Sequence, residues 1–312
     1  RGLGDVYKRQ FLSLSSFLDN SHSVKKFNVI IFFSLIFISF SCSSKTETFN
    51  KYVSKEKNLQ FLVAQGKLHW DKRVNIKDAN LAKLFLSKAN ELNPDNAEIV
   101  ELYARACHFV GYYLQSNLDK SDSLFIEGMN TTWSYIISTN AYQEGAALFD
   151  GDSTGKKIAG ITNISKEMVP ILYWWASNYS RYLSKKPVMD RLQSRDLIET
   201  ALHRILSLEP DYFYHGANRL FGGIYARLPG VELNLSMNNF DKAITGSPNY
   251  LGTYVVRAEY LHTKSGNREA FTKDLQMVLN ADPTLLPNIS PENLFEQEKA
   301  KQLLLKEASL FE

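Results

Sequence analysis

The chain has 312 residues, with acidic and basic side chains mixed throughout and a formal net charge of only +3. This charge distribution lacks the basic stripe that nucleic-acid binding needs, so we expect no nucleic-acid partner. Sixteen tyrosines and nineteen phenylalanines are many for a polar helical surface, and they indicate an aromatic-lined interior or cleft.

The N-terminal region predicts a leader and a signal peptide. Residues 1–23 include no initiating Met and look like a translated sequencing adapter, so we expect them to be an artefactual leader. Residues 24–41 follow with two lysines and then an apolar run of 15 residues, Phe27 to Ser41. That length fits the core of a signal peptide and falls short of the about 20 residues of a membrane-spanning helix.

A cysteine directly follows the apolar run. Ser41 and Cys42 give the small residue and cysteine of a bacterial lipobox, although Ser39 stands where Leu is usual. We expect Cys42 to carry acyl groups that anchor the protein to a membrane, because two or more acyl chains hold stably. The alternative is an ordinary secretory signal with an incidental Cys. A polar tether over residues 42–53 and a single helical domain over residues 54–312 would follow.

Helical periodicity recurs from residue 54 to the C-terminus, and no strand pattern stands out. Residues 150–155 are expected to form a loop because of their Gly, Asp, Ser and Thr content. The expected helices are 54–71, 77–92, one that starts at Pro94 and runs to Tyr113, one capped by Ser121 or Asp122 that continues through Ile136, one capped by Asn140 that ends near Phe149, 165–185, 188–208, 212–228, 235–245, 249–264, 267–281, and 291–309 with Ser290 as its cap.

Prolines mark turns at a regular spacing. Pro210, Pro248 and Pro283 each follow an amphipathic run, 38 and then 35 residues apart, and Pro94 marks a similar turn. This spacing is close to the about 34 residues of tetratricopeptide-like helix pairs, which must stack to bury their apolar faces. The predicted fold is all-α, with stacked antiparallel helix pairs in a helical-repeat domain that contains a cleft or pore.

No motif for catalysis or metal binding is present. The segment from Gly151 to Lys157 resembles a phosphate loop, but its spacing and context do not match one. The six histidines occur without metal-ligand spacing, and Cys107 lies on an apolar helix face as an expected core residue. We therefore expect no enzyme activity, no catalytic residue, no metal and no cofactor.

Two helices combine aromatic rings with polar side chains. Residues 168–183 carry large rings on both faces together with Asn178 and Arg181, which need partners if they are buried. Residues 216–230 contain the adjacent Gly222 and Gly223, whose cost in mid-helix indicates close helix packing or a ligand near the backbone. The candidate ligand-binding residues are Tyr173, Trp174, Asn178, Arg181, Asn218, Phe221, Tyr225 and Arg227.

A series of short motifs occurs in a specific order and spacing along the second half of the chain. They are Val169–Trp174, Leu183–Ser184, Leu208–Tyr212, Gly216–Ala217, Leu220–Ala226, Leu228–Pro229, Tyr254–Tyr260, Ala281–Pro283, Asn293–Leu294, Ala300–Leu304 and Leu310–Phe311. With these motifs, the chain from about residue 55 to 312 resembles the T-component (TatT) family of TRAP transporters. It departs from the family at Val231–Asn234, where a Gly-Gly-Asp-like turn is usual.

The resemblance implies a periplasmic lipoprotein on the face of a bacterial membrane, associated with the solute-binding protein of a TRAP transporter. It also implies a homotrimer with an apolar pore or cleft in each protomer, and it brings no catalytic residue. We expect the protein to dock that partner and to conduct a hydrophobic or amphipathic organic acid, with Arg181 or Arg227 pairing its carboxylate. The alternative is a general helical-repeat lipoprotein scaffold for cell-envelope assembly that has no small-molecule ligand.

Overall fold

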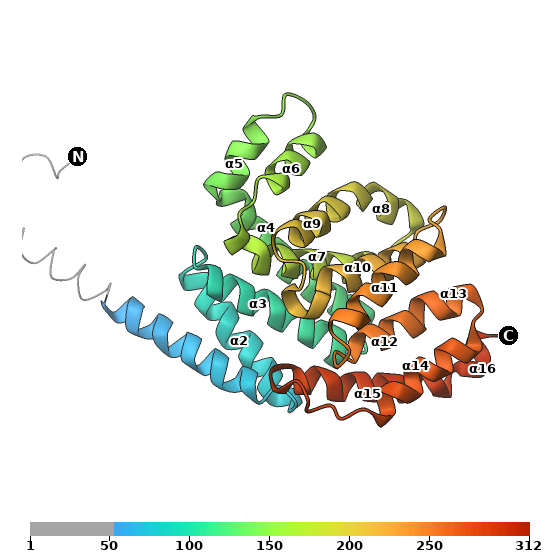
Figure 1. The fold of residues 1–312 in the computed structure, drawn as a ribbon. Helices are drawn as coiled ribbons and strands as arrows, with labels where there is room; N and C mark the ends of the chain where they lie inside the picture. Colours follow the sequence, from blue (N-terminus) through green and yellow to red (C-terminus); the bar gives the residue numbers. More distant parts are fainter. Residues whose placement is uncertain (1–52) are drawn as a thin grey trace, which may run out of the picture. The chain divides into compact units, whose positions relative to one another are not determined.

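Helices joined by short connections make up the described part of the chain, residues 53–312 of the computed structural model (Figure 1). The expected leader (1–23), signal peptide (24–41), Cys42 and nearly all of the tether (42–53) lie outside the described residues. Residues 53–312 contain no strand, so the predicted all-α fold class is confirmed. None of their helices is both long enough and apolar enough to cross a membrane.

Contacts divide the chain into two units, Arg1–Asn58 and Leu59–Glu312, and the second unit contains every element from α2 onward. A first helix covers residues 53–71. The elements after it are α2 (Ile76–Leu92), α3 (Ala97–Phe109), η1 (Val110–Leu114), α4 (Leu118–Ser138), α5 (Asn140–Ala147), α6 (Ser153–Thr162), η2 (Lys166–Met168), α7 (Val169–Leu183), α8 (Val188–Gln193), α9 (Arg195–Leu208), α10 (Tyr212–Arg227), α11 (Leu233–Gly246), α12 (Gly252–Val256), η3 (Arg257–His262), α13 (Thr263–Ser265), α14 (Arg268–Asn280), η4 (Pro287–Ile289), α15 (Ser290–Leu305) and α16 (Glu307–Leu310).

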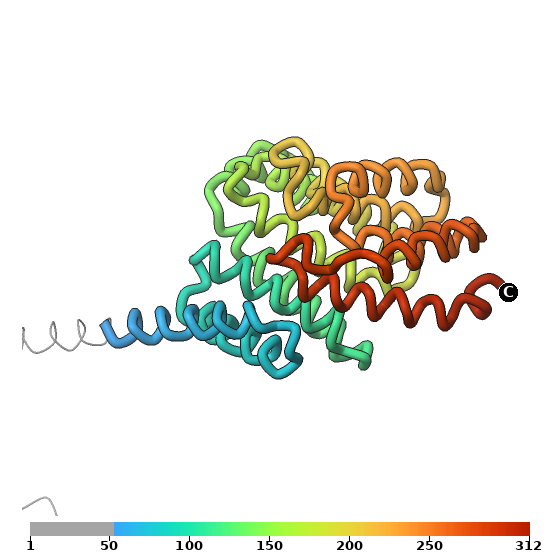
Figure 2. The backbone as a smooth tube through the Cα atoms, turned by 60° about the horizontal axis from the view of Figure 1, so that its bottom comes forward, coloured from blue at the N-terminus to red at the C-terminus, as the bar shows by residue number. Residues whose placement is uncertain are grey.

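Consecutive helices of the second unit pack against one another in pairs. Helix α2 packs on α3, α5 on α6, α10 on α11, and α14 on α15. Figure 2 follows the same residues as a series of helical hairpins from cyan to red. Helix α7 is central because it packs against α3, α4, α9 and α10, which lie far apart in the sequence.

Three of the predicted proline turns share one backbone geometry. Helices α2, α9 and α11 end directly before Asn93, Glu209 and Ser247, whose φ/ψ angles are −145/76°, −154/79° and −144/69°. Each of these residues precedes a proline, which disfavours the helical region for the residue before it. Helix α14 ends at Asn280, one residue before its predicted end, and the following Ala281 has φ/ψ of −76/150°. The proline pattern therefore located four helix ends to within one residue.

Several predicted helix starts were wrong, mostly by a few residues. Asn117 caps α4, where its side chain accepts from the Lys120 N–H at 3.0 Å, so neither Ser121 nor Asp122 is the cap. The Ser121 hydroxyl instead donates to the Gly111 carbonyl at 2.8 Å, inside the fold. Asn is favoured at the N-cap of a helix because its short side chain reaches the free backbone N–H groups of the first turn.

The other differences from the predicted boundaries have similar local causes. Thr139 rather than Asn140 caps α5, Asn96 caps α3 so that Pro94 stays in the preceding turn, and Ser290 is the first residue of α15 rather than its cap. The predicted loop at 150–155 is shorter than expected, because the Asp152 carboxylate accepts from the Gly155 N–H at 2.7 Å and starts α6 at Ser153. The predicted helix 188–208 breaks at Ser194 into α8 and α9.

The two adjacent glycines of α10 have different roles. A Cβ at Gly222 would lie 2.8 Å from the ring of Phe240, a fully buried residue of α11, so close helix packing requires this glycine. A Cβ at Gly223 would meet its nearest neighbour, a methyl of Val256, at 3.4 Å, which is ordinary contact. Only Gly222 is therefore needed for packing, and Gly223 leaves space beside the backbone.

Candidate functional site

Two cavities lie between α7 and α10 and share part of their walls. The arginine-rich chamber has an empty volume of about 690 Å³, including the part open to solvent, and the aromatic chamber has about 510 Å³. Their shared lining residues are Arg181, Leu220, Arg219 and Val256. The two chambers are therefore neighbours, and whether they join into a pore stays a prediction.

The arginine-rich chamber has a largely apolar wall, and its charged lining residues are all cations. Five arginines line it, and no Asp or Glu does. Its apolar wall comes from α7, α9 and α10 and includes Leu183, Ile198, Ile224 and Leu228. An apolar cavity surrounded by guanidinium groups suits an anion with an apolar body, because guanidinium binds carboxylates with two parallel hydrogen bonds. The arginines are Arg181, Arg191, Arg195, Arg219 and Arg227.

The aromatic chamber has mixed charge. Its rings come from η1, α7, the start of α10 and Tyr250, and its charged lining residues are three arginines and two glutamates. The rings are Phe109, Tyr112, Tyr113, Tyr173, Trp174, Phe213 and Tyr250, and the charged residues are Arg105, Arg181, Arg219, Glu292 and Glu296.

Arg181 is held at the shared wall by two tyrosines from π-helical segments. The Arg181 guanidinium carbon lies 3.6 Å from the ring centroid of Tyr112 in η1, and its Nη1 donates to the hydroxyl of Tyr260 in η3 at 3.3 Å. Burial opposes the charge, but the neighbouring Tyr112, Tyr260 and acidic groups raise the pKa of Arg181, so it stays cationic. π-Helical turns are rare and frequently occur at functional sites. Both such turns in the described chain supply a ring to this guanidinium.

Arg219 supports a strained turn at the start of α10. Phe213, Tyr214 and His215 have φ of 46°, 57° and 54°, the left-handed region that costs about 1–2 kcal/mol per residue. The Arg219 guanidinium donates to the Tyr214 carbonyl at 3.1 Å, to the Phe213 carbonyl at 3.3 Å and to the Tyr173 hydroxyl at 2.8 Å. These bonds satisfy carbonyls that a right-handed turn would direct elsewhere, and the turn brings Phe213 to the aromatic chamber.

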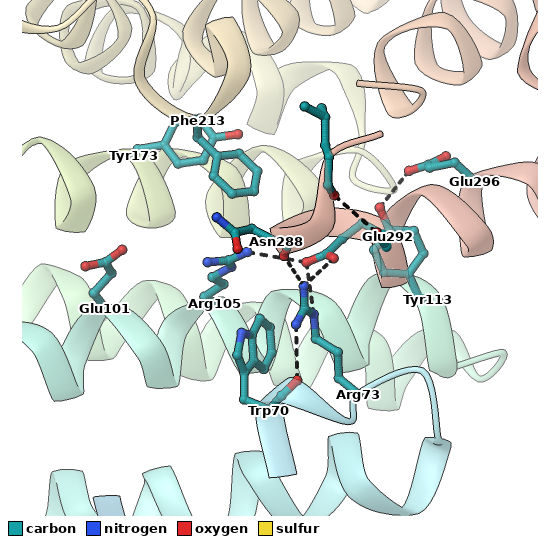
Figure 3. A network of polar contacts seen from close by, with 12 residues as sticks. Trp70, Arg73, Glu101, Arg105, Tyr113, Tyr173, Phe213, Asn288, Glu292 and Glu296 are labelled. Atoms are coloured by element: carbon teal, nitrogen blue, oxygen red, sulfur yellow. Dashed lines mark hydrogen bonds and ion pairs between the residues drawn. The ribbon is translucent and has the colours of Figure 1, made fainter. Parts of the chain in front are cut away.

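A buried ion-pair cluster closes the aromatic chamber on the side of α15. The Glu292 carboxylate accepts from Arg73 Nη2 at 2.6 Å and from Arg73 Nε at 3.2 Å, and Arg105 Nη2 lies 3.5 Å away. Arg73 and Glu292 are only 3% and 5% exposed. Figure 3 shows both arginines pointing toward Glu292, with the Tyr113 hydroxyl turned to Glu296. This cluster joins residues 219 positions apart and fixes one wall of the chamber.

Other titratable groups near the chambers are held in their uncharged forms. Burial, together with Arg181, Arg219, Arg105 and Lys299, lowers the pKa of His108 well below its ordinary value, so the imidazole is neutral at pH 7. Burial raises the pKa of the Cys107 thiol to about 12, which is consistent with its expected place in the core. Among residues 53–312, no cluster of three or more His, Cys, Asp or Glu is arranged to hold a metal ion.

Four of the eight candidate residues line the chambers. Tyr173 and Trp174 line the aromatic chamber, Arg227 lines the arginine-rich chamber, and Arg181 lines both. Arg227 is already engaged, because it donates to the Ser184 carbonyl and lies 4.6 Å from the Tyr260 ring centroid. A role of these residues in ligand binding stays a prediction.

The other four candidates lie among neither set of lining residues. The amide of Asn178 donates to the carbonyls of Ala104 and Trp174 and packs against Gly128, so it joins helices. Asn218 donates to Asn239 of α11 at 3.2 Å. Phe221 is buried against His203 and Tyr225, and Tyr225 contacts Glu199 of α9.

Several chamber residues were not predicted, although part of the signal was present. Arg219 shares one face of α10 with Gly223 and the predicted Arg227, because the three recur every four residues. The sequence has no such signal for six other residues of the aromatic chamber, because they come from three separate regions of the chain. These residues are Arg105, Tyr112, Tyr113, Tyr250, Glu292 and Glu296.

Comparison with known proteins gives one finding. A family model described as TRAP transporter T-component matches residues 81–311. A search of curated proteins finds no match. The matched range includes all lining residues of both chambers.

Proposed function

Because the chain belongs to the TRAP transporter T-component family, we propose that it docks the solute-binding protein of that transporter and binds an amphipathic organic acid. The family implies association with a TRAP transporter, and it is a family of transporter components rather than of enzymes. Docking and ligand binding are the steps that the proposal adds.

The arginine-rich chamber is the observation that carries the ligand proposal. An apolar cavity lined by five arginines and no acid favours a ligand with an apolar tail and a carboxylate. The carboxylate would lie at Arg181, on the wall that the two chambers share, and the tail would extend along Ile198, Ile224 and Leu228. Passage of such an acid between this protein and its partner is the proposed contribution to transport.

The proposed location is the periplasmic face of a bacterial membrane. Cys42 would carry the lipid anchor, and the mature protein would be a homotrimer, as the family resemblance implies. Acid hydrolysis and mass spectrometry of the membrane-extracted protein would detect the acyl groups, and a Cys42→Ser variant should leave the membrane fraction. Recovery of that variant with the membranes would contradict anchoring through this residue.

Titration calorimetry with octanoate tests the ligand proposal. We expect Arg181→Ala and Trp174→Ala to weaken octanoate binding, the first by removing the cation and the second by removing a wall of the aromatic chamber. Arg268→Ala is the matched control, because this arginine is exposed and pairs only with Glu307 at 2.8 Å. If both chamber variants bound octanoate and the solute-binding protein as the unaltered protein does, the site assignment would be wrong.

A further inference from the structure

The aromatic chamber contains buried polar groups that have no hydrogen-bond partner within the protein. Four of its lining residues contribute one atom each, namely Arg105 Nε, Trp174 Nε1, Ser177 Oγ and Glu296 Oε2. Trp174, Ser177 and Glu296 are 3%, 1% and 2% exposed. An unpaired buried donor or acceptor costs about 1–3 kcal/mol. Four around one cavity indicate that a polar molecule completes these bonds.

Two of the three donors among these groups, Trp174 Nε1 and Ser177 Oγ, lie on α7, and the third, Arg105 Nε, comes from α3. Trp174, Ser177 and Arg181 are spaced by three and four residues along α7, so their side chains share one helix face. The indole N–H donates only, the hydroxyl can donate, and the guanidinium has five N–H groups, of which the Tyr260 hydroxyl takes one. A face made of donors suits a carboxylate, which only accepts.

The acceptor among these groups comes from another helix. Glu296 of α15 accepts from the Tyr113 hydroxyl through Oε1 at 2.7 Å, and its Oε2 has no partner in the protein. A carboxylate oxygen requires a donor. Because Glu296 and the α7 donors line the same small chamber, a ligand that satisfies both sides must carry a hydrogen-bond donor close to its own carboxylate.

The charge of the lining decides between the two common donors, a hydroxyl and an ammonium. Three arginines and two glutamates leave one net positive charge on the lining side chains. This charge favours a ligand with a net negative charge over a neutral zwitterion. The lining therefore suits a hydroxy acid better than an amino acid.

We propose that the aromatic chamber recognises the head group of a hydroxy carboxylic acid whose hydroxyl lies next to the carboxylate. The α7 donors hold the carboxylate, and Glu296 Oε2 accepts a hydrogen bond from the hydroxyl. The inference rests on the proposed function, which places the apolar tail of the same molecule in the arginine-rich chamber. It adds the hydroxyl as the group that the protein selects.

Calorimetry with three matched acids tests the selection, using the lipid-free protein, residues 43–312. We expect 2-hydroxyoctanoate to bind at least about tenfold more tightly than octanoate, since one hydrogen bond to a charged group contributes about 1.5–3 kcal/mol. We expect 2-aminooctanoate to bind more weakly than 2-hydroxyoctanoate. If octanoate bound and the hydroxyl added nothing, this inference would fail while the proposed function stood.

Two further outcomes would each overturn a defined part of the account. If none of the three acids bound, both the ligand proposal and this inference would fail. If 2-aminooctanoate bound most tightly, the selected donor would be an ammonium and the hydroxy-acid assignment would be wrong.

Conservative variants locate the effect. Glu296→Gln keeps the side-chain shape and should abolish the tenfold preference for the hydroxy acid, and Ser177→Ala should weaken all three acids. Ser207→Ala is the matched control, because this serine is exposed, donates to the Arg204 carbonyl at 2.8 Å and lines neither chamber. Circular dichroism confirms that each variant is folded before titration. A full preference retained in Glu296→Gln would overturn the role of this carboxylate.

Nitrogen–proton NMR reports on the chamber independently of affinity. The protein has four tryptophans, so Trp174→Phe identifies the indole N–H signal of Trp174. This signal should shift when 2-hydroxyoctanoate is added, because its N–H has no partner in the protein. An unmoved signal at saturating acid would place the ligand elsewhere and overturn the inference.

Discussion

Breaking the buried pair of Arg73 and Glu292 should destabilise the protein more than breaking an exposed ion pair. Its two hydrogen bonds, of 2.6 and 3.2 Å, join side chains that are 3% and 5% exposed, and Arg105 adds a second cation at 3.5 Å. Removing one partner of such a pair leaves an uncompensated buried charge and typically costs about 3–5 kcal/mol. We expect Glu292→Gln to lose a free energy of unfolding in this range.

Urea unfolding followed by helical circular dichroism measures the loss. The matched control is Lys88→Ala, because Lys88 and Glu91 pair at 2.8 Å with side chains that are 54% and 57% exposed. An exposed helical pair contributes about 0.3–0.5 kcal/mol. The double variant Arg73→Met/Glu292→Gln should recover part of the loss, because it leaves no unpaired Arg73.

A Glu292→Gln variant as stable as the Lys88→Ala control would refute this reasoning. It would mean that water or a local rearrangement compensates the two arginines. An equal loss in the single and double variants would also contradict the reasoning, because the damage would then not come from an unpaired Arg73.

Three other predictions follow from the packing and the pKa shifts. Gly222→Ala should destabilise the protein by about 1–3 kcal/mol, because the new Cβ overpacks on Phe240. Gly223→Ala should not destabilise it, because the new Cβ would meet only ordinary contacts. Chemical unfolding of both variants compares their free energies of unfolding. Because the pKa of His108 is lowered in the folded state, the unfolded state binds the proton more readily, so stability should fall as pH decreases below about 6.5. His108→Gln should make that fall shallower in urea titrations at pH 7 and 5, and an identical pH dependence would argue against a buried neutral imidazole. Cys107, with its pKa raised to about 12, should resist a thiol reagent at pH 8 until urea is added, and fast labelling of the folded protein would contradict its burial.

The fold was largely predictable because its signals are local. Apolar periodicity located the helices, and prolines located the ends of α2, α9 and α11 because proline restricts the residue before it. Helix starts were less predictable, since Ser, Thr, Asn and Asp compete for the cap at closely spaced positions such as Asn117 and Ser121. The left-handed turn at Phe213–His215 had no sequence signal, because these residue types avoid that conformation elsewhere.

The candidate site was only half predictable. Aromatic residues and arginines occur together in α7 and again in α10. Tyr173, Trp174, Arg181 and Arg227 could therefore be predicted from the sequence. Asn178 looked similar in the sequence but bonds α7 to α3, and Asn218 bonds to Asn239 of α11 and lines a separate cavity. Sequence alone does not separate a polar residue that joins helices from one that lines a cavity. Glu292 and Glu296 reach the chamber through the packing of α15.

Affinity capture of the solute-binding protein tests the central claim most directly. The lipid-free protein, residues 43–312, is used to capture partners from periplasmic extract, and co-eluting proteins are identified by mass spectrometry. We predict a TRAP solute-binding protein in near-stoichiometric amount. Its absence, with envelope-assembly proteins captured instead, would contradict the docking proposal and favour the scaffold alternative.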